Sequence, residues 1–253
     1  VFEANSSHKY DVADYSKVDG MFGTNEELQE LVNKAKKQGM RVIVDGVFNH
    51  TGSDSIYFNK YGKYNSLGAY QSKDSPYYRW FDFSDYPNEY RSWWGIDVLP
   101  STNKENPDYI EFITGEGGVL DKYTKLGIGG WRFDVVDELP SAMVKKIRKR
   151  VKGINPNALL IGEVWEDATN KIAYGNRREY FQGKELDSVM NYPLKDAILD
   201  FIKTGEVNNL SLLIKQQCDR YPKEALNTLM NILATHDTFR LLSAIEGSGE
   251  GKT

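Results

Sequence analysis

Cysteine, histidine and long hydrophobic runs are scarce in this sequence, and each scarcity excludes a class of protein. A single cysteine, Cys218, rules out an internal disulfide framework. No apolar run approaches the length of a membrane-spanning helix, and the first residues lack a signal-peptide pattern. We therefore expect a cytoplasmic protein. Secretion stays open as the alternative, because we expect the start of the parent protein to be missing.

Basic residues are not in excess either. The 32 lysines and arginines are outnumbered by 36 acidic residues, which gives a net charge of −4 and argues against a nucleic-acid partner. Aromatic residues, in contrast, are crowded between Tyr57 and Trp94. Flat amphipathic rings suit the faces of sugars, and the alternative is that these rings fill a core.

Strand and helix signals alternate along the chain, which predicts βα units and a parallel sheet. A closed (β/α)₈ barrel needs eight strands. We expect an incomplete TIM barrel that holds about strands three to seven, with two strands missing in front and one behind. The five expected strands are residues 41–45, 130–134, 159–164, 188–191 and 230–235.

Domain boundaries follow from where the periodicity stops. Residues 51–102 show no clean pattern, and fifty such residues are too many for a plain loop, so we expect an inserted subdomain there. Residues 1–50 and 103–253 would form the partial barrel. Thr24 and Glu27 predict a capping box at one helix start. Asn106-Pro107 predicts another helix start, with Pro at the first position.

Three acidic residues stand at the ends of apolar strands, where burying charge is costly unless it is useful. Arg132 and Asp134 share a strand face, so the guanidinium should keep Asp134 ionised, as a nucleophile requires. Apolar neighbours should keep Glu163 protonated, as a general acid requires. On adjacent strand ends, the two carboxyl groups should lie roughly 5–5.5 Å apart, the spacing for a retaining glycosidase. Asp237 is expected to hold sugar hydroxyls, with His50 and His236 as further donors.

Two other interpretations of these acids are less favoured. A buried ion-pair network around Arg132 would explain one or two of them, but three acids on three strand ends exceed what one arginine needs. A metal-dependent barrel hydrolase is disfavoured, because the three histidines, His8, His50 and His236, do not have metal-ligand spacing.

Four stretches in order carry a resemblance to a known family: residues 45–50 (DGVFNH), 130–138 (GWRFDVVDE), 162–165 (GEVW) and 235–237 (THD). In order and spacing they resemble the four sequence regions of the α-amylase family, glycoside hydrolase family 13. Within it, residues 93–95 (WWG), 99–103 (LPSTN) and 190–193 (MNYP) are similar to the neopullulanase, cyclomaltodextrinase and maltogenic amylase group. Ser101 and Thr102 depart from that group's usual pattern.

The resemblance implies a role for each matching residue. Asp134 would be the nucleophile, Glu163 the acid/base and Asp237 the transition-state stabiliser. Arg132 would orient the nucleophile, and Asp45 would support the site from behind. Side chains placed at the substrate would be those of Tyr10, His50, Trp165, Glu166 and His236.

The family implies an activity and partners as well. We expect a retaining hydrolase of α-1,4 glucosidic bonds, with α-1,6 bonds as a second linkage, acting on maltooligosaccharides, cyclodextrins, starch or pullulan. A 4-α-glucanotransferase and an inactive carbohydrate-binding relative or fragment are the alternatives. We expect no membrane partner and no required cofactor. Calcium is the one ion the family suggests, through Asn49, with Asp54, Asp82 and Asp85 as loose candidates. The parent enzyme is expected to form a homodimer in the manner of related enzymes.

Overall fold

The computed structural model describes residues 1–247, which divide into two compact units, Val1–Leu160 and the part that begins at Ile161. The division falls inside one strand, β7 (Leu159–Gly162). The expected insertion at residues 51–102 lies within the first unit, and its independence as a subdomain stays a prediction. Within residues 1–247, no helix combines the length and the hydrophobicity needed to cross a bilayer.

Two parallel strands form the centre of the first unit. Strand β3 (Ile43–Gly46) pairs in parallel with β6 (Gly130–Phe133), and Asp45 lies opposite Arg132. The N–H of Leu159 at the start of β7 donates to the carbonyl oxygen of Gly129 at 2.9 Å. Ahead of them, β1 (Phe2–Ala4) and β2 (Val12–Val18) form an antiparallel pair that the sequence did not predict.

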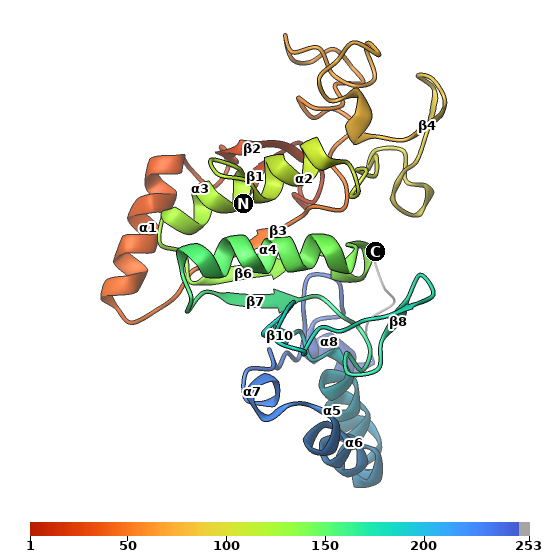
Figure 1. Ribbon diagram of the computed structural model, residues 1–253. Coiled ribbons are helices and arrows are strands. Elements are labelled where there is room, and N and C mark those ends of the chain that lie inside the picture. The colour runs from red at the N-terminus through yellow and green to blue at the C-terminus, as the bar shows by residue number, and fades with distance from the viewer. Residues whose placement is uncertain (248–253) are drawn as a thin grey trace. The chain divides into compact units, whose positions relative to one another are not determined.

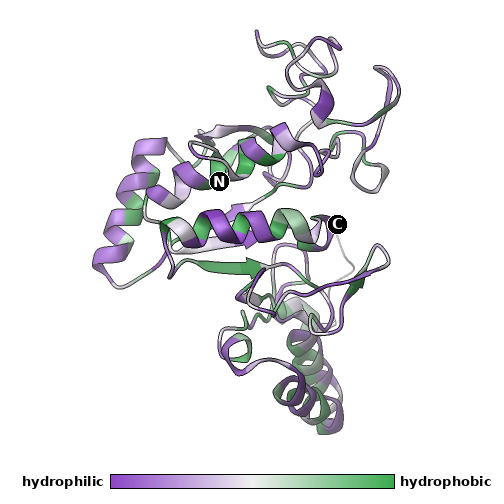
Figure 2. Cartoon of the chain, viewed as in Figure 1, coloured by the Kyte–Doolittle hydropathy of each residue, from purple (hydrophilic) through white to green (hydrophobic). Residues whose placement is uncertain are grey.

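Helices fill the connections of the first unit (Figure 1). Helix α1 (Asn25–Lys37) begins with the predicted capping box, in which Thr24 and Glu27 each satisfy the other's backbone N–H. Its surface is mostly polar (Figure 2). The predicted helix start at Asn106-Pro107 is also confirmed. The chain continues through α2 (Pro107–Thr114), α3 (Val119–Lys125) and α4 (Ser141–Ile154), which pack against one another.

The core of the first unit is rich in aromatic rings. Trp131 and Phe133 of β6 are fully buried and meet Phe2 and Phe48. The segment between β3 and α2 is irregular, with two short 3₁₀ turns and one hairpin. These are η1 (Tyr78–Trp80), β4 (Phe83–Asp85), β5 (Glu89–Tyr90) and η2 (Trp93–Gly95). A third 3₁₀ turn, η3 (Val136–Glu138), follows β6.

In the second unit, β7 pairs in parallel with β10 (Ser188–Val189). Strand β7 is hydrophobic along its length (Figure 2), as a buried parallel strand should be. A small hairpin, β8 (Ile172–Ala173) and β9 (Asn176–Arg177), lies between them in sequence. The remaining helices are α5 (Tyr192–Thr204), α6 (Val207–Arg220), α7 (Lys223–Leu226) and α8 (Leu241–Glu246).

One predicted strand is wrong. Residues 230–235 form no strand, and their only sheet contact is a single parallel bridge between Met190 and Met230. A strand is stabilised by a ladder of backbone hydrogen bonds, and β10 beside it is only two residues long. Apolar residues in this segment, such as Leu233, are correspondingly exposed rather than buried.

Candidate active site

The parallel register of β3 and β6 builds one half of the candidate site. Because Asp45 and Arg132 are direct neighbours in the ladder, their side chains rise from the same face. Asp134 follows two residues after Arg132 and therefore also projects from that face. Its backbone N–H donates to the carbonyl oxygen of Gly46 at 3.2 Å, which ties the end of β6 to the end of β3.

Arg132 joins the two carboxylates of this unit. Its Nη1 donates to Oδ1 of Asp134 at 2.8 Å and to both oxygens of Asp45 at 3.0 Å. The side chains of Arg132 and Asp134 are each 9% exposed. Charge-assisted hydrogen bonds of this kind are strong and directional, so the guanidinium fixes the position of the Asp134 carboxylate. The predicted proximity of Arg132 and Asp134 is confirmed, whereas the catalytic role of Asp134 stays a prediction.

Directly after Asp134 the backbone adopts a costly conformation. Val135 has φ 39° and ψ 52°, in the left-handed region, which a β-branched residue rarely occupies. Such a conformation costs about 1–3 kcal/mol and persists only where the surrounding structure imposes it. The turn carries the chain from β6 into η3, and no feature of the sequence around Val135 had signalled it.

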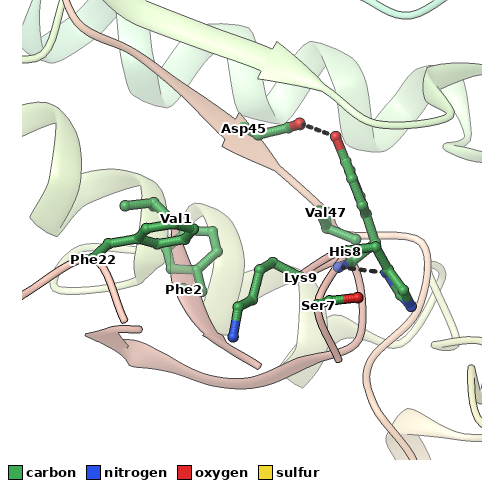
Figure 3. A pocket seen from close by; sticks show the side chains of 9 residues that line it. Val1, Phe2, Ser7, His8, Lys9, Phe22, Asp45 and Val47 are labelled. Carbon is green, nitrogen blue, oxygen red and sulfur yellow. Dashed lines mark hydrogen bonds between the residues drawn. The ribbon is translucent and has the colours of Figure 1, made fainter. Parts of the chain in front are cut away.

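Tyr10 closes this group from another segment. Its hydroxyl donates to Oδ2 of Asp45 at 2.9 Å, and the Arg132 guanidinium lies 5.9 Å from its ring centre. Burial and the neighbouring Asp45 raise the pKa of Tyr10, so its hydroxyl remains a donor. Asp45 and Tyr10 line a cavity of about 230 Å³ (Figure 3). The remaining lining residues are Val1, Phe2, Ser7, His8, Lys9, Phe22 and Val47.

His50 is held by protein groups on both ring nitrogens. Nδ1 faces Asn49 Nδ2 at 3.0 Å, and Nε2 faces the carbonyl oxygen of Tyr10 at 3.1 Å. Burial lowers the pKa of His50 to about 4, so the ring is neutral at neutral pH. Trp93 stacks on it with ring centres 5.2 Å apart. This group brings His50 next to Tyr10, and the contact of both residues with a sugar, which the family resemblance implies, stays a prediction.

The aromatic residues of the irregular segment divide into two kinds. Tyr57, Phe58, Trp80 and Phe81 are buried and form a core, which was the alternative to a sugar-binding role. Trp94 is 80% exposed and stacks on Trp93 at 5.0 Å. Its exposure leaves one indole face open to a ligand.

The second unit carries the other half of the candidate site. Glu163 follows β7 and is 4% exposed. Its Oε1 accepts a hydrogen bond from Trp165 Nε1 at 3.2 Å. Trp165 in turn stacks face to face on Tyr192, with ring centres 4.0 Å apart. Tyr192 was not among the predicted site residues. The stack on Tyr192 fixes the Trp165 indole, which donates to Glu163. Trp165 therefore positions Glu163, in addition to any contact that it makes with a sugar.

The remaining predicted residues of this unit lie at the surface. Glu166 forms an ion pair with Lys171. Oδ2 of Asp237 lies 3.1 Å from Nε2 of His236, with side chains 40% and 51% exposed respectively. The Asp237 N–H donates to Thr235 Oγ1 at 3.2 Å. Asp134 belongs to the first unit, and Glu163 and Asp237 belong to the second. The predicted carboxyl spacing of Asp134 and Glu163 therefore stays a prediction.

A calcium site does not fit the residues that the sequence suggested. Asn49 Oδ1 accepts from the Lys104 ammonium at 2.7 Å, so this candidate calcium ligand already faces a positive charge. Asp54 lies 3.5 Å from the Lys63 ammonium, and Asp82 accepts from the Asn103 amide. Among residues 1–247, no group of three or more His, Cys, Asp or Glu side chains is placed to hold a metal ion.

Parallel strands that alternate with helices, with carboxylates directly after the strands, define the class: part of an α/β barrel of the kind that carries enzyme active sites. The sequence model of the protein family described as "Alpha amylase, catalytic domain" matches residues 1–252 of this chain. The chain therefore belongs to the α-amylase family, as its four sequence regions had led us to expect.

Individual relatives agree with this assignment. A cyclomaltodextrinase from a Bacillus species is 32% identical over 98% of this chain. An amylopullulanase from Thermoanaerobacterium saccharolyticum is 36% identical over 96% of it. The chain spans 43% and 21% of the lengths of these relatives. The solved structure of cyclic α-maltosyl-(1→6)-maltose hydrolase from Arthrobacter globiformis shares 27% identity. Its TM-score is 0.86, with 98% of this chain and 53% of that chain covered. The expected barrel class is thereby confirmed.

Proposed function

We propose that the full-length protein containing this chain is a retaining glycosidase of α-glucans. Its substrates would be maltooligosaccharides, cyclodextrins, starch or pullulan, cleaved at α-1,4 bonds, with α-1,6 bonds as a second linkage. The observation that carries the proposal is the Arg132–Asp134 pair: a buried carboxylate is held ready by a guanidinium at the end of a barrel strand. Membership of the α-amylase family and relatives named cyclomaltodextrinase and amylopullulanase support it.

The proposed mechanism is a double displacement. Glu163 protonates the glycosidic oxygen while the Asp134 carboxylate attacks the anomeric carbon, which forms a covalent glycosyl-enzyme and releases the shortened glucan. Glu163 then removes a proton from water, which hydrolyses the intermediate and returns Asp134 to its ionised form. Asp237 would hold sugar hydroxyls as the ring flattens. Tyr10 would offer its ring face to the sugar, and His236 a polar contact.

The test is a digestion of β-cyclodextrin, pullulan and soluble starch by the full-length protein. Asp134→Asn and Glu163→Gln are each expected to lower kcat by several orders of magnitude, since each removes a group that bonds to or protonates the substrate. Asp108→Asn, an exposed acid at the start of α2, is the matched control and should retain activity. An Asp134→Asn variant with the same activity as the wild type would contradict the proposal.

Two further readouts sharpen the test. Proton NMR of early products should show the α-anomer first, because two inversions at the anomeric carbon give retention. Reducing ends should accumulate as substrate is consumed. Redistribution of maltooligosaccharide lengths without new reducing ends would instead identify a 4-α-glucanotransferase. Absence of turnover together with retained glucan binding would identify an inactive relative.

A further inference from the structure

Lys104 is buried at a place where a lysine is unusual. It stands between the irregular segment and α2, only 8% exposed, and its Nζ lies 2.7 Å from Oδ1 of Asn49 and 3.5 Å from the Asn49 carbonyl oxygen. The same carbonyl oxygen also accepts from the N–H and the hydroxyl of Thr102. Burying an ammonium costs several kcal/mol of folding free energy unless protein oxygen atoms replace the water around it. The two Asn49 oxygens make this replacement for Lys104.

Two carboxylates, Glu138 and Asp82, favour the charged form of Lys104 without forming an ion pair with it. Burial lowers the pKa of Lys104 to about 8, with Arg91 acting in the same direction and Glu138 and Asp82 acting against it. Both of the atoms that Lys104 Nζ contacts are oxygens, the acceptors that an ammonium binds, and an ammonium has three donors and no acceptor. It can only face the oxygen of the Asn49 amide, never its nitrogen.

This orientation passes to the neighbouring histidine. With Oδ1 committed to Lys104, Asn49 Nδ2 donates to His50 Nδ1 at 3.0 Å. Nδ1 must then lack a proton, and the ring proton lies on Nε2, which donates to the carbonyl oxygen of Tyr10 at 3.1 Å. The chain of donors runs from Lys104 through Asn49 and His50 to Tyr10 and allows only one tautomer.

We propose that Lys104 is a positioning residue whose ammonium takes the place of a divalent cation at Asn49 and fixes the orientation of the Asn49 amide, whose Nδ2 then donates to His50 Nδ1. The proposal stands on the geometry of the first unit alone and does not depend on the proposed glycosidase activity. It has two consequences that can be measured separately: the state of the His50 ring, and the response of stability to divalent cations.

The first measurement is nitrogen-15 NMR of the histidine side chains at pH 7, with His50→Gln used to assign the His50 signals. In the wild type, His50 Nδ1 should resonate as an unprotonated nitrogen and Nε2 as a protonated one. Lys104→Met, which has a side chain of similar length without the charge, should shift the Nδ1 signal, because the Asn49 amide that donates to Nδ1 is no longer held, while Nε2 stays protonated against the Tyr10 carbonyl oxygen. Lys104→Arg should leave the signals in place. Lys122→Met, at an exposed position of α3, is the matched control. Unchanged His50 signals in Lys104→Met would overturn the positioning role.

The second measurement is thermal unfolding with excess EDTA and, separately, with millimolar calcium chloride. The wild-type melting temperature should be the same in both, because the charge at Asn49 is part of the chain. A melting temperature that falls in EDTA and recovers with calcium would show a resident ion and overturn the replacement of the metal. Far-UV circular dichroism checks that Lys104→Met is folded. If that variant does not fold, Lys104→Gln takes its place in the NMR measurement.

Discussion

At the scale of single residues, Arg132 is a positive partner shared by two carboxylates of the first unit. One guanidinium nitrogen donates to both Asp45 of β3 and Asp134, which directly follows β6. Breaking a buried pair by removal of one partner is more costly than never having had the pair, because the remaining charge stays buried.

Arg132→Met tests this arrangement without any activity assay. We expect the free energy of unfolding to fall by about 3 kcal/mol, since two carboxylates lose their shared partner. Arg220→Met removes the half-exposed partner of Asp167 and should cost at most about 1 kcal/mol, as surface pairs do. Urea unfolding of both variants measures the difference. Equal losses in the two variants would show that Arg132 does not act as a buried counter-charge.

At the scale of elements, glycines decide where the strands can approach. A Cβ added at Gly130, the first residue of β6, would lie 2.2 Å from the carbonyl oxygen of Leu159 and 2.7 Å from its nitrogen. These are backbone atoms at the start of β7 and cannot rotate away. Gly153 in α4 is the opposite case, because an added Cβ would meet no atom within 4 Å.

The two glycines make a matched pair of alanine substitutions. Gly130→Ala is expected to lower the free energy of unfolding by about 3 kcal/mol or more, because the neighbouring backbone must shift. Gly153→Ala should raise it by about 0.5–1 kcal/mol, since alanine restricts the unfolded chain and favours helix. Chemical denaturation of both variants measures the two effects. A tolerated Gly130→Ala would mean that β6 and β7 do not approach as closely as described.

At the scale of the whole molecule, acid stability depends on carboxylates that hold helices together. Oδ2 of Asp121 in α3 accepts from Lys125 at 2.7 Å and from the Gly117 N–H at 3.0 Å. The hydrogen bond from Lys125 is the main cause that lowers the pKa of Asp121 below its ordinary value of 3.8. Between the folded and unfolded pKa values the unfolded chain binds more protons, so this stabilisation is present above pH 3.8 and disappears as the pH falls through the folded value.

Asp121→Asn should therefore lower stability at neutral pH and flatten its decline in acid. Urea unfolding at a series of pH values from neutrality to below pH 4 measures both effects. Glu116→Gln, which changes an exposed acid nearby, should leave the slope as in the wild type. An Asp121→Asn profile parallel to the wild type down to the lowest pH would show that this carboxylate does not contribute to the acid transition.

How far the sequence predicts this molecule depends on how local each signal is. The capping box at Thr24 and the helix start at Asn106 involve residues three apart, and both are confirmed. The pairing of Arg132 with Asp134 follows from strand periodicity over two residues. The strand expected at residues 230–235 fails because a strand needs a partner ladder that its own residues do not encode. The site roles of Asp134, Glu163 and Asp237 rest on resemblance and stay predictions.

Contacts between distant residues were beyond sequence reasoning. Lys104 and Asn49 are 55 positions apart, and only the folded chain brings them together. The stack of Trp165 on Tyr192 likewise joins the residue after a strand region to the first residue of a helix. Periodicity cannot reveal such pairs, because the intervening chain sets their distance.

The ammonium of Lys104 affects how the folded protein acquires a positive charge at Asn49. An amine that is synthesised with the polypeptide needs no loading step, meets no competition from other ions, and is part of every copy of the chain. The medium in which the protein works, whether rich or poor in mineral ions, has no means of changing its occupancy.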